Sequence, residues 1–422
     1  MTNLRVTLTC AILSLILISG SSFAASGENY WPNWRGPDYT GVAKNANPPV
    51  TWSETENIKW KVENPGEGLS SPIIWGNKII FLTAIKSTGN AYKFDVVCID
   101  RETGKTIWQK TAIETVPHEG KHNTGSFASG SAVTDGKYIW AGFGSRGVHC
   151  YDMDGNHKWS RDLGKMKILA SFGEGSSVVL AGDAIIVVMD QEGPSKIYAL
   201  NKETGETLWE KDRDEGTSWA TPLPMEFDGK IQIITSATKL IRSYDLKTGD
   251  VIWQCSGQTK NVIPSPVPYG NEVICTSGFS GNKIQCIELG HNGDLNGTDA
   301  IKWQVSSRTT PYVPSPMLYG DRFYVLFNNN EVLSCYNAKD GKPLYESQKL
   351  DGAKGYYASP VGAADKVYLA SQNGTTVVVK NADKYEVLAA NKLDDNFDAS
   401  PAIVDNQIIL RGHKSIYCIE EK

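Results

Sequence analysis

The chain lacks an excess of positive charge, and no long block of like charge occurs in it. Among its 422 residues, 42 Lys and Arg stand against 47 Asp and Glu, for a formal net charge of −5. A nucleic-acid-binding domain usually presents a basic face, so this balance argues against a nucleic-acid partner. The apolar run at 8–18 is too short to span a bilayer.

That apolar run has the features of a secretory signal. Arg5 precedes it, and a small-residue cleavage pattern ends at Ala24. No cysteine follows the run where a lipid-acceptor cysteine would stand. We therefore expect residues 1–24 to be a signal peptide, and the mature protein to be exported to the periplasm or secreted, soluble, without a transmembrane anchor.

An eightfold repeat with a period of about 45 residues fills the rest of the chain. Its first half is Ser-Pro or a near equivalent, an apolar run, a Gly/Asn/Asp turn and a second apolar run. Copies include SSPIIWGNKIIFL (70–82), PSPVPYGNEVICT (264–276), PSPMLYGDRFYVL (314–326) and ASPVGAADKVYLA (358–370). In looser copies Ala132 and Ser177 take the Pro position. Two hairpins per unit are typical of a β-propeller blade.

The second half of the unit is a strand ending in Asp or Asn, a Thr-Gly turn, and a strand closed by Trp. Copies include CIDRETGKTIW (98–108), ALNKETGETLW (199–209) and SYDLKTGDVIW (243–253). The Asp or Asn side chain caps the turn, and Gly takes the positive φ that a tight hairpin requires. The sequence thus predicts an all-β, eight-bladed propeller with four-stranded antiparallel blades.

The last unit is incomplete, because the chain stops after SIYCIEEK (415–422). The missing fourth strand matches NIKWKVE (57–63), so we expect the strand around Trp60 to complete the last blade and close the ring. Residues 57–422 are then one propeller. Residues 25–56, rich in Trp and Pro without strand periodicity, form an irregular N-terminal arm packed on it.

The cysteines follow the repeat. Five of them share one blade position, which Ala199 and Ser243 fill in other copies: Cys98, Cys150, Cys286, Cys335 and Cys418. A position that accepts Ala, Ser or Cys is a small buried site, where Cys acts as a small hydrophobe. Cys275 and Cys286, on adjacent strands of one hairpin, remain a possible disulfide pair.

Three short motifs resemble ligand sites. His118–His122 matches HExxH, but Pro117 and Gly120 do not favour the helix that a zinc site needs. Gly142–Gly147 matches GxGxxG, but a strand follows where a dinucleotide site needs a helix. Asn292, Asp294 and Asn296 alternate like half of a calcium loop and are weak candidates, because the twelfth position lacks Glu. We expect solvated loops and turns at all three, and no metal.

The Trp-closed unit resembles the tryptophan-docking motif of the pyrroloquinoline quinone (PQQ)-like repeat propellers. The arm segment WPNWRGP (31–37) is also similar to the start of exported proteins of that group. The resemblance implies eight blades in which each Trp docks on the Gly-containing turn of a neighbouring blade. It assigns this role to Trp60, Trp108, Trp159, Trp209, Trp253 and Trp303, with Tyr345 and Leu388 as departures.

The family holds two functional classes. Quinoprotein alcohol dehydrogenases bind PQQ and calcium in the channel, typically beneath a disulfide of adjacent cysteines, and this sequence has no Cys-Cys pair. The other class resembles the non-catalytic propeller subunit of the outer-membrane barrel-assembly machinery, which binds proteins. The resemblance favours a non-enzymatic binding or scaffolding propeller of the cell envelope, with a PQQ-dependent dehydrogenase as the alternative.

The repeat also indicates where a ligand would bind. The loops that lead into the Ser-Pro strands should meet at one mouth of the channel, and several carry an aromatic residue. The candidate mouth residues are Phe127, Phe172, Trp219, Tyr312, Tyr357, Phe397 and Asp398. These rings either form a site for a planar ligand, a sugar or a protein partner, or only pack the blades together. We expect a monomer.

Overall fold

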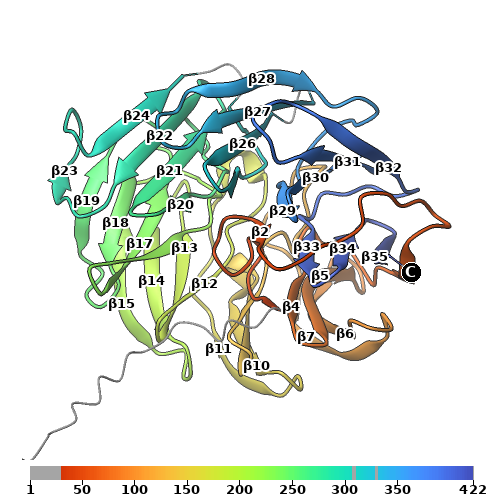
Figure 1. Ribbon diagram of the computed structural model, residues 1–422. Helices are drawn as coiled ribbons and strands as arrows, with labels where there is room; N and C mark the ends of the chain where they lie inside the picture. Colours follow the sequence, from red (N-terminus) through yellow and green to blue (C-terminus); the bar gives the residue numbers. More distant parts are fainter. Residues whose placement is uncertain (1–29, 307–309, 328–330, 422) are drawn as a thin grey trace, which may run out of the picture.

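The computed structural model describes residues 30–306, 310–327 and 331–421, so the expected signal peptide lies outside the described residues. The described residues form eight β-sheets of four or five strands, arranged as blades around a central channel (Figure 1). The prediction of an all-β, eight-bladed propeller is confirmed. Within the described part of the chain, no helix is both long and apolar enough to cross a membrane.

Each blade contributes one strand to each of four concentric layers. The innermost strands are β4 (Ile73–Trp75), β8 (Val133–Thr134), β12 (Val179–Ala181), β16 (Leu223–Phe227), β20 (Val267–Tyr269), β25 (Met317–Tyr319), β29 (Val361–Ala363) and β33 (Ala402–Val404). The second strands are β5 (Lys78–Lys86), β9 (Tyr138–Gly142), β13 (Ala184–Met189), β17 (Lys230–Ser236), β21 (Glu272–Ser277), β26 (Arg322–Phe327), β30 (Lys366–Ala370) and β34 (Gln407–Arg411).

The two outer layers complete the blades. The third strands are β6 (Tyr92–Asp100), β10 (Val148–Asp152), β14 (Ser195–Asn201), β18 (Ile241–Asp245), β22 (Lys283–Glu288), β27 (Val332–Asn337), β31 (Thr375–Lys380) and β35 (Ser415–Ile419). The outermost strands are β7 (Thr106–Thr115), β11 (His157–Arg161), β15 (Thr207–Arg213), β19 (Val251–Cys255), β24 (Ile301–Val305), β28 (Pro343–Lys349), β32 (Val387–Lys392) and β3 (Ile58–Glu63).

Burial explains the sequence pattern of these layers. Middle strands such as β13 are buried along their whole length between neighbouring blades, so they read as continuous apolar runs. Outer strands such as β15 are largely exposed, and in β15 Trp209 and Arg213 are the buried residues. The core is therefore divided among the interfaces between blades, and no blade can bury its faces alone.

The N-terminal strand β3 closes the ring. It pairs with β35 at the outer edge of the eighth blade, with Trp60 opposite Cys418. The blade therefore joins a strand from each end of the propeller sequence, as the incomplete last repeat predicted.

Five tryptophans dock on the next blade in the same way. The Trp159 indole nitrogen donates to the Lys202 carbonyl (3.1 Å). Its ring faces Gly205, whose φ is +74° and where a Cβ would lie 2.5 Å from the ring. A residue with a Cβ would be strained at this position, both by the positive φ and by contact with the indole. The same contact, an indole donating to a turn carbonyl with a glycine beneath the ring, is made by Trp60, Trp108, Trp209 and Trp303.

Trp253 differs from this pattern. It is fully buried, and its indole nitrogen lies 3.3 Å from Gln232 Oε1 of its own blade. The next blade has an insertion at the position where five other blades have a turn that contains glycine. A segment of that insertion, β23 (Gly293–Asp294), pairs in parallel with β19 as a fifth strand. The expected docking turn is absent there because the insertion covers the edge instead.

The shared cysteine position lies opposite the docking aromatic residue. Cys98 pairs with Trp108, Cys150 with Trp159, and the Ala199 equivalent with Trp209. A small side chain leaves room for the indole. All seven described cysteines, including Cys275 and Cys286, are buried free thiols, so the possible disulfide between those two is not formed.

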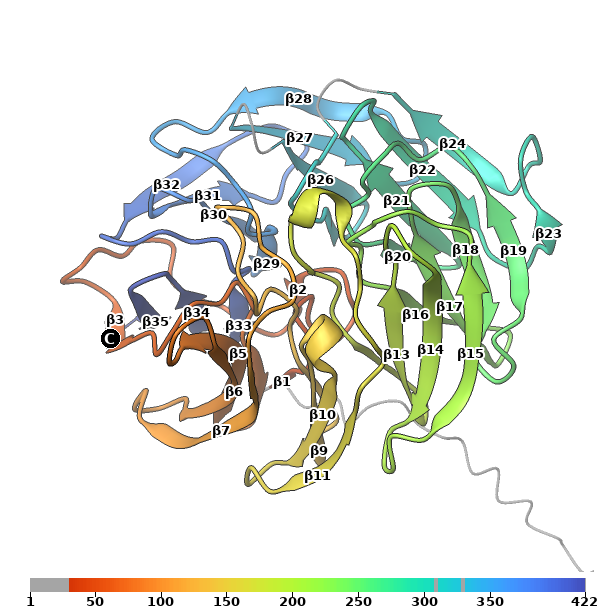
Figure 2. The same ribbon diagram turned by 180° about the vertical axis from the view of Figure 1, so that it is seen from behind.

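The first part of the N-terminal arm, residues 30–46, lies inside the channel at one end of the ring, and residues 47–56 run outward over the seventh and eighth blades. Its strand β1 (Tyr30–Trp31) pairs with β4, and β2 (Val42–Ala43) pairs in parallel with β29. Figure 1 is seen from this end and shows the arm around β2 at the centre of the ring. Figure 2 shows the opposite end, where the long connections and the short 3-10 helices η1 (Gly144–Arg146) and η2 (Leu169–Ser171) lie in front.

Candidate functional site

A cavity of about 310 Å³ opens at the end of the channel opposite the arm. We call it the cup. Its walls are the loops that lead into the innermost strands, and every blade contributes to the lining. Its volume falls at the lower end of the ~300–1,000 Å³ typical of small-molecule sites.

A closed ring of hydroxyl side chains encircles the base of the cup. Each side-chain oxygen accepts the backbone N–H of the equivalent residue one blade earlier, at 2.9 to 3.1 Å, and the eighth bond runs from the Ser400 N–H to Ser71 Oγ. The members of this hydroxyl ring are Ser71, Ser131, Ser177, Thr221, Ser265, Ser315, Ser359 and Ser400.

The hydroxyl ring corrects one register assignment and explains the Ser-Pro motif. Ser177 occupies the Ser position of the third blade, because its Oγ accepts the Ser131 N–H and its own N–H reaches Thr221 Oγ1. Val178, not Ser177, therefore stands at the Pro position. The Ser of the motif is needed because its hydroxyl accepts a hydrogen bond from the neighbouring blade. The repeated sequence alone does not show this role.

The arm forms the floor of the cup. Trp34 lines the cavity, and the buried Arg35 beside it donates to the carbonyls of Pro316 (2.8 Å) and Pro360 (3.0 Å) on two neighbouring blades. Burial lowers the pKa of Arg35 to about 9, which still leaves it charged at neutral pH. The arm thus reaches up the channel as far as the hydroxyl ring and lines the base of the cup with Trp34.

Five of the seven candidate mouth residues line the cup: Phe172, Trp219, Tyr312, Tyr357 and Asp398. Trp219 is fixed by an indole hydrogen bond to the Gly173 carbonyl (2.7 Å), and Tyr312 stacks on Phe279 at 5.2 Å. The aromatic residues lie on two sides, with Phe172 and Trp219 on the loops into the third and fourth blades. Tyr312 and Tyr357 lie on the loops into the sixth and seventh.

The other two candidates lie elsewhere. Phe397 is fully buried and packs edge-on against Tyr417 at 5.9 Å, so it belongs to the core of the eighth blade. Phe127 contacts Tyr92 and Arg146 and lines a second pocket. Both are aromatic residues just before a Ser-Pro strand, and sequence spacing could not show which way each ring points.

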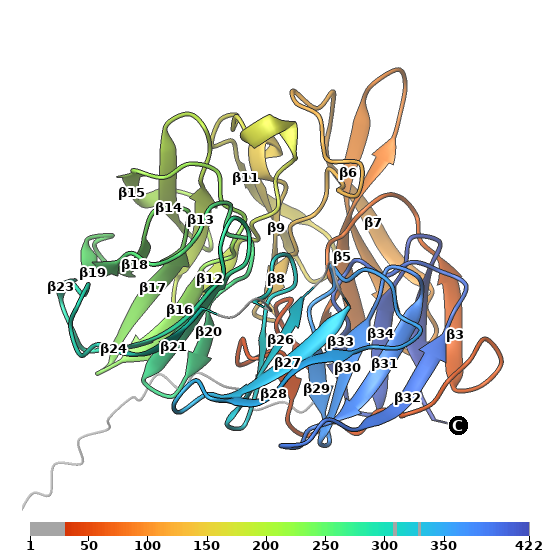
Figure 3. The ribbon, with the colours of Figure 1, turned by 90° about the horizontal axis from the view of Figure 1, so that it is seen from above.

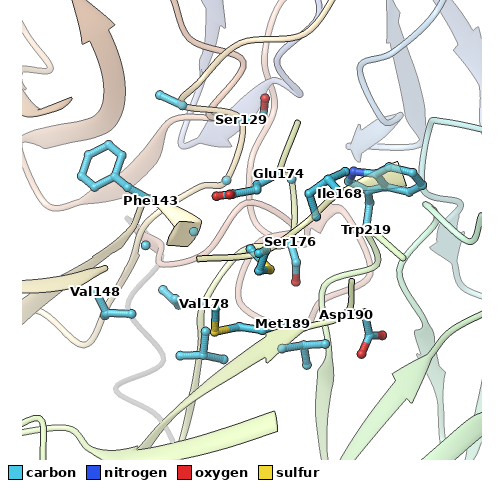
Figure 4. Close-up of a pocket in the computed structure, with 18 of the residues that line it drawn as sticks. Ser129, Phe143, Val148, Ile168, Glu174, Ser176, Val178, Met189, Asp190 and Trp219 are labelled. Carbon is cyan, nitrogen blue, oxygen red and sulfur yellow. The ribbon is translucent and has the colours of Figure 1, made fainter. Parts of the chain in front are cut away.

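That second pocket is a small chamber of about 30 Å³ between the second and third blades. Figure 4 shows Glu174 near the middle of its lining, Ile168 and Trp219 on one side, and Val178 and Met189 below. Its lining shares Ser129, Glu174 and Trp219 with the cup. The chamber therefore lies directly beside the larger cavity.

The two carboxylates of the cup wall already have partners. Glu174 forms a buried ion pair with Arg146 at 2.9 Å and accepts the Ser145 N–H. Asp398 accepts from Gln372 Nε2 and from His413 Nε2, both at 2.7 Å. The hydrogen bond to Asp398 raises the pKa of His413 above its usual value. Both acidic groups are thus locally neutralised.

Three residues of the loop 117–126 line the cup: His122, Thr124 and Gly125. The loop belongs to the edge of the ring that is uppermost in Figure 3. His118 lies 2.8 Å from the Met166 carbonyl, the Ile168 N–H donates to Glu119, and His122 lies 2.7 Å from Thr124. The two imidazoles of the HExxH match therefore bind different partners. Thr124 in turn donates to the Tyr357 hydroxyl at 3.0 Å, which links the loop to the seventh blade.

The other two motifs form turns. Gly142–Gly147 joins β9 to β10 through η1. In the insertion, Asp294 Oδ1 accepts the Asn296 N–H (2.9 Å), and Asn296 Oδ1 accepts from Ser256. The third weak metal candidate, Asn292, lies in the same insertion. Among the described residues, no group of three His, Cys, Asp or Glu side chains is placed to hold a metal ion.

The fold and site define a closed propeller with a single cup at one mouth, and comparison with known proteins gives its family. The family described as "Outer membrane protein assembly factor BamB" matches residues 92–322 and 195–421, and the chain belongs to it. No curated protein matches the chain.

Solved structures share the fold at low sequence identity. BamB from Moraxella catarrhalis is 14% identical with a TM-score of 0.57, covering 85% of this chain and 98% of that one. A europium-containing methanol dehydrogenase is 10% identical with a TM-score of 0.66, covering 92% and 91%. Quinohemoprotein alcohol dehydrogenase from Comamonas testosteroni is 11% identical with a TM-score of 0.62, covering 93% and 81%.

The cup does not suit PQQ with a calcium ion. PQQ is a planar quinone with three carboxylates, and burying that much negative charge without a cationic partner is costly. The described lining residues include no Lys or Arg, and two of them are the carboxylates Glu174 and Asp398. The oxygens of those carboxylates are already engaged with protein donors, which leaves no free acidic ligand set for the metal.

Proposed function

We propose that this protein is an exported, non-enzymatic binding propeller of the cell envelope, and that it binds its ligand or partner at the cup. One observation carries the proposal: the channel is filled from one end by the protein's own arm, and the other end is a preformed aromatic and hydroxyl-lined cup. Membership of the BamB family supports a binding role. The signal-like sequence at 1–24 supports export.

A PQQ-dependent dehydrogenase is the alternative, because the fold also resembles the alcohol and methanol dehydrogenases. A titration with PQQ, with and without Ca²⁺, followed by thermal melting and by quinone absorbance, separates the two. A ligand that binds only the folded state at a hundred times its Kd stabilises it by about 2.7 kcal/mol.

The binding proposal predicts no quinone-dependent rise in melting temperature and no change in the quinone spectrum. A saturable rise that requires both PQQ and Ca²⁺ would favour the dehydrogenase. Trp219→Ala then locates the effect, because a rise caused by binding in the cup must shrink in that variant. Leu208→Ala is the matched control, since Leu208 lies on the outer strand β15 with half of its surface exposed (51%).

A further inference from the structure

The hydroxyl ring has hydrogen-bonding capacity that the fold does not use. A Ser or Thr hydroxyl has one donor hydrogen and two acceptor lone pairs. In each member of the ring the fold uses one lone pair, for the backbone N–H of the preceding blade. Among the described residues, no acceptor is found for the eight hydroxyl hydrogens. The base of the cup therefore presents donors and acceptors in one circle.

The walls above this circle are aromatic on two sides. The indole hydrogen bond to the Gly173 carbonyl holds Trp219 in orientation. Gly175 packs closely on the same ring, because a Cβ added to Gly175 would lie 3.2 Å from Trp219 Cδ1. Across the cup, the Tyr357 hydroxyl accepts from Thr124. Because these hydrogen bonds fix both rings, a ligand that stacks on them meets a preorganised surface.

Charge narrows the ligand class further. The carboxylates Glu174 and Asp398 are paired with Arg146 and His413, and the described lining residues include no Lys or Arg. An anionic ligand would find no Lys or Arg among these lining residues to compensate its charge. A cationic ligand would have to compete with partners already within hydrogen-bond distance. An uncharged ligand meets neither obstacle.

Hydrogen bonding then separates two kinds of uncharged ligand. A flat apolar ring would cover the hydroxyl ring without satisfying it, and each buried unsatisfied polar group costs about 1–3 kcal/mol. A polyhydroxylated ring satisfies the same groups and still offers a C–H face to an aromatic side chain. Resting on the binding function proposed above, we propose that the cup binds an uncharged saccharide, which stacks on the aromatic walls and hydrogen-bonds to the hydroxyl ring.

Isothermal titration calorimetry of the mature protein tests this assignment. The probes are cellobiose, maltose and the disaccharide of N-acetylglucosamine, with glucuronate as the charged comparison. We expect saturable binding of at least one neutral disaccharide, and weaker or no binding of glucuronate. Loss of a stacking surface should weaken binding about tenfold in Trp219→Ala.

A gentler variant keeps the test valid if Trp219→Ala disturbs the fold. Asn261 lines the cup at a φ of +55°, a conformation that glycine adopts freely, so Asn261→Gly removes the amide without backbone strain. We expect weaker sugar binding at unchanged melting temperature. Leu208→Ala, on the outer strand, should bind as the unaltered protein does.

The assignment is overturned if none of the three neutral disaccharides gives saturable heat, if glucuronate binds more tightly than all of them, or if both cup variants bind sugar as well as the control. The PQQ titration keeps this result separate from the proposed function. Failure of the sugars without quinone binding removes the saccharide assignment alone, whereas a quinone- and Ca²⁺-dependent rise in melting temperature removes both.

Discussion

The two ends of the channel are built from the same eight inner strands but treated in opposite ways. At the arm end, Arg35 donates to backbone carbonyls and apolar residues such as Val42 are buried in the channel. At the cup end, the hydroxyl ring retains unused donors and the aromatic walls are only partly buried. The comparison shows that the N-terminal arm occupies one mouth of the channel, whereas the other mouth is left available for binding.

Ring closure affects both ends, so its loss should have the largest effect. Deleting residues 57–63 removes β3 and leaves β35 as an unpaired edge. We expect loss of the cooperative melting transition, because blades are not stable separately. Circular dichroism melting measures this.

A milder variant sharpens the same point. Trp60→Ala should destabilise the protein by about 3–5 kcal/mol. Lys61→Ala removes an exposed ion pair with Glu54 at the neighbouring position and should cost no more than about 1 kcal/mol. Unchanged melting after the deletion would show that the ring does not depend on this strand.

The arm end is tested next by Arg35→Met, which keeps the length of the side chain and removes its donors. The carbonyls of Pro316 and Pro360 lose a charged partner, and such bonds contribute about 1.5–3 kcal/mol each. We expect a loss of stability of about 3 kcal/mol in urea unfolding and faster amide exchange in the arm. Lys44→Met is the control, since Lys44 lies on the same arm but is exposed. Equal exchange rates in the two variants would contradict a plug held by Arg35.

The hydroxyl ring should give an intermediate effect. In Ser265→Ala the buried Thr221 N–H loses its acceptor, which should cost about 1–3 kcal/mol of unfolding free energy. Thr221→Ser keeps the hydroxyl that accepts the Ser177 N–H and should change stability by less than that. Urea unfolding of the two variants in parallel is the measurement. If Ser265→Ala proves neutral, the ring bonds do not hold the blades together.

The smallest effect concerns the rim of the cup and depends on pH. The pKa of His413 is raised in the folded protein by its hydrogen bond to Asp398. The stabilisation is therefore fully present below the unfolded pKa of about 6.5 and is lost as pH rises through the higher folded value. His413 is half exposed, so the effect should not exceed about 1 kcal/mol.

We expect His413→Gln to be less stable than the unaltered protein at pH 5.5 and equally stable at pH 9, by urea unfolding at both values. An equal deficit at both pH values would show that the imidazolium is not what stabilises this contact.

The repeat made the blades predictable, because each strand carries the apolar pattern of its layer and the turn glycine stands four residues before the closing Trp of its unit. The ring-closing strand was predictable for the same reason, because the last repeat lacks a fourth strand and residues 57–63 match the missing piece. The arm was not predictable in detail, since WPNWRGP has no periodicity and its path depends on Arg35 meeting carbonyls more than 280 residues away.

Departures from the repeat explain the remaining differences. In the third blade Val178 stands where most blades have Pro, so the sequence alone aligned Ser177 with the Pro position. The hydrogen bonds of Ser177 show that it occupies the Ser position instead. An insertion removed the turn expected beneath Trp253. At the mouth, sequence indicated where aromatic residues gather, but the burial of Phe397 depends on packing in three dimensions.

The difference between the two ends can be tested most directly by thiol labelling. Background reaction should be low, because all seven described cysteines are buried and burial raises the pKa of thiols such as Cys98 and Cys335 to about 12. The two probes are Asn261→Cys in the cup and Val42→Cys in the arm, each in protein that lacks residues 1–24. We predict that a maleimide labels the cup variant rapidly in the folded state and labels the arm variant only on unfolding. Equally rapid labelling of both would show that the arm does not close the channel, and would contradict the account of a one-ended cup.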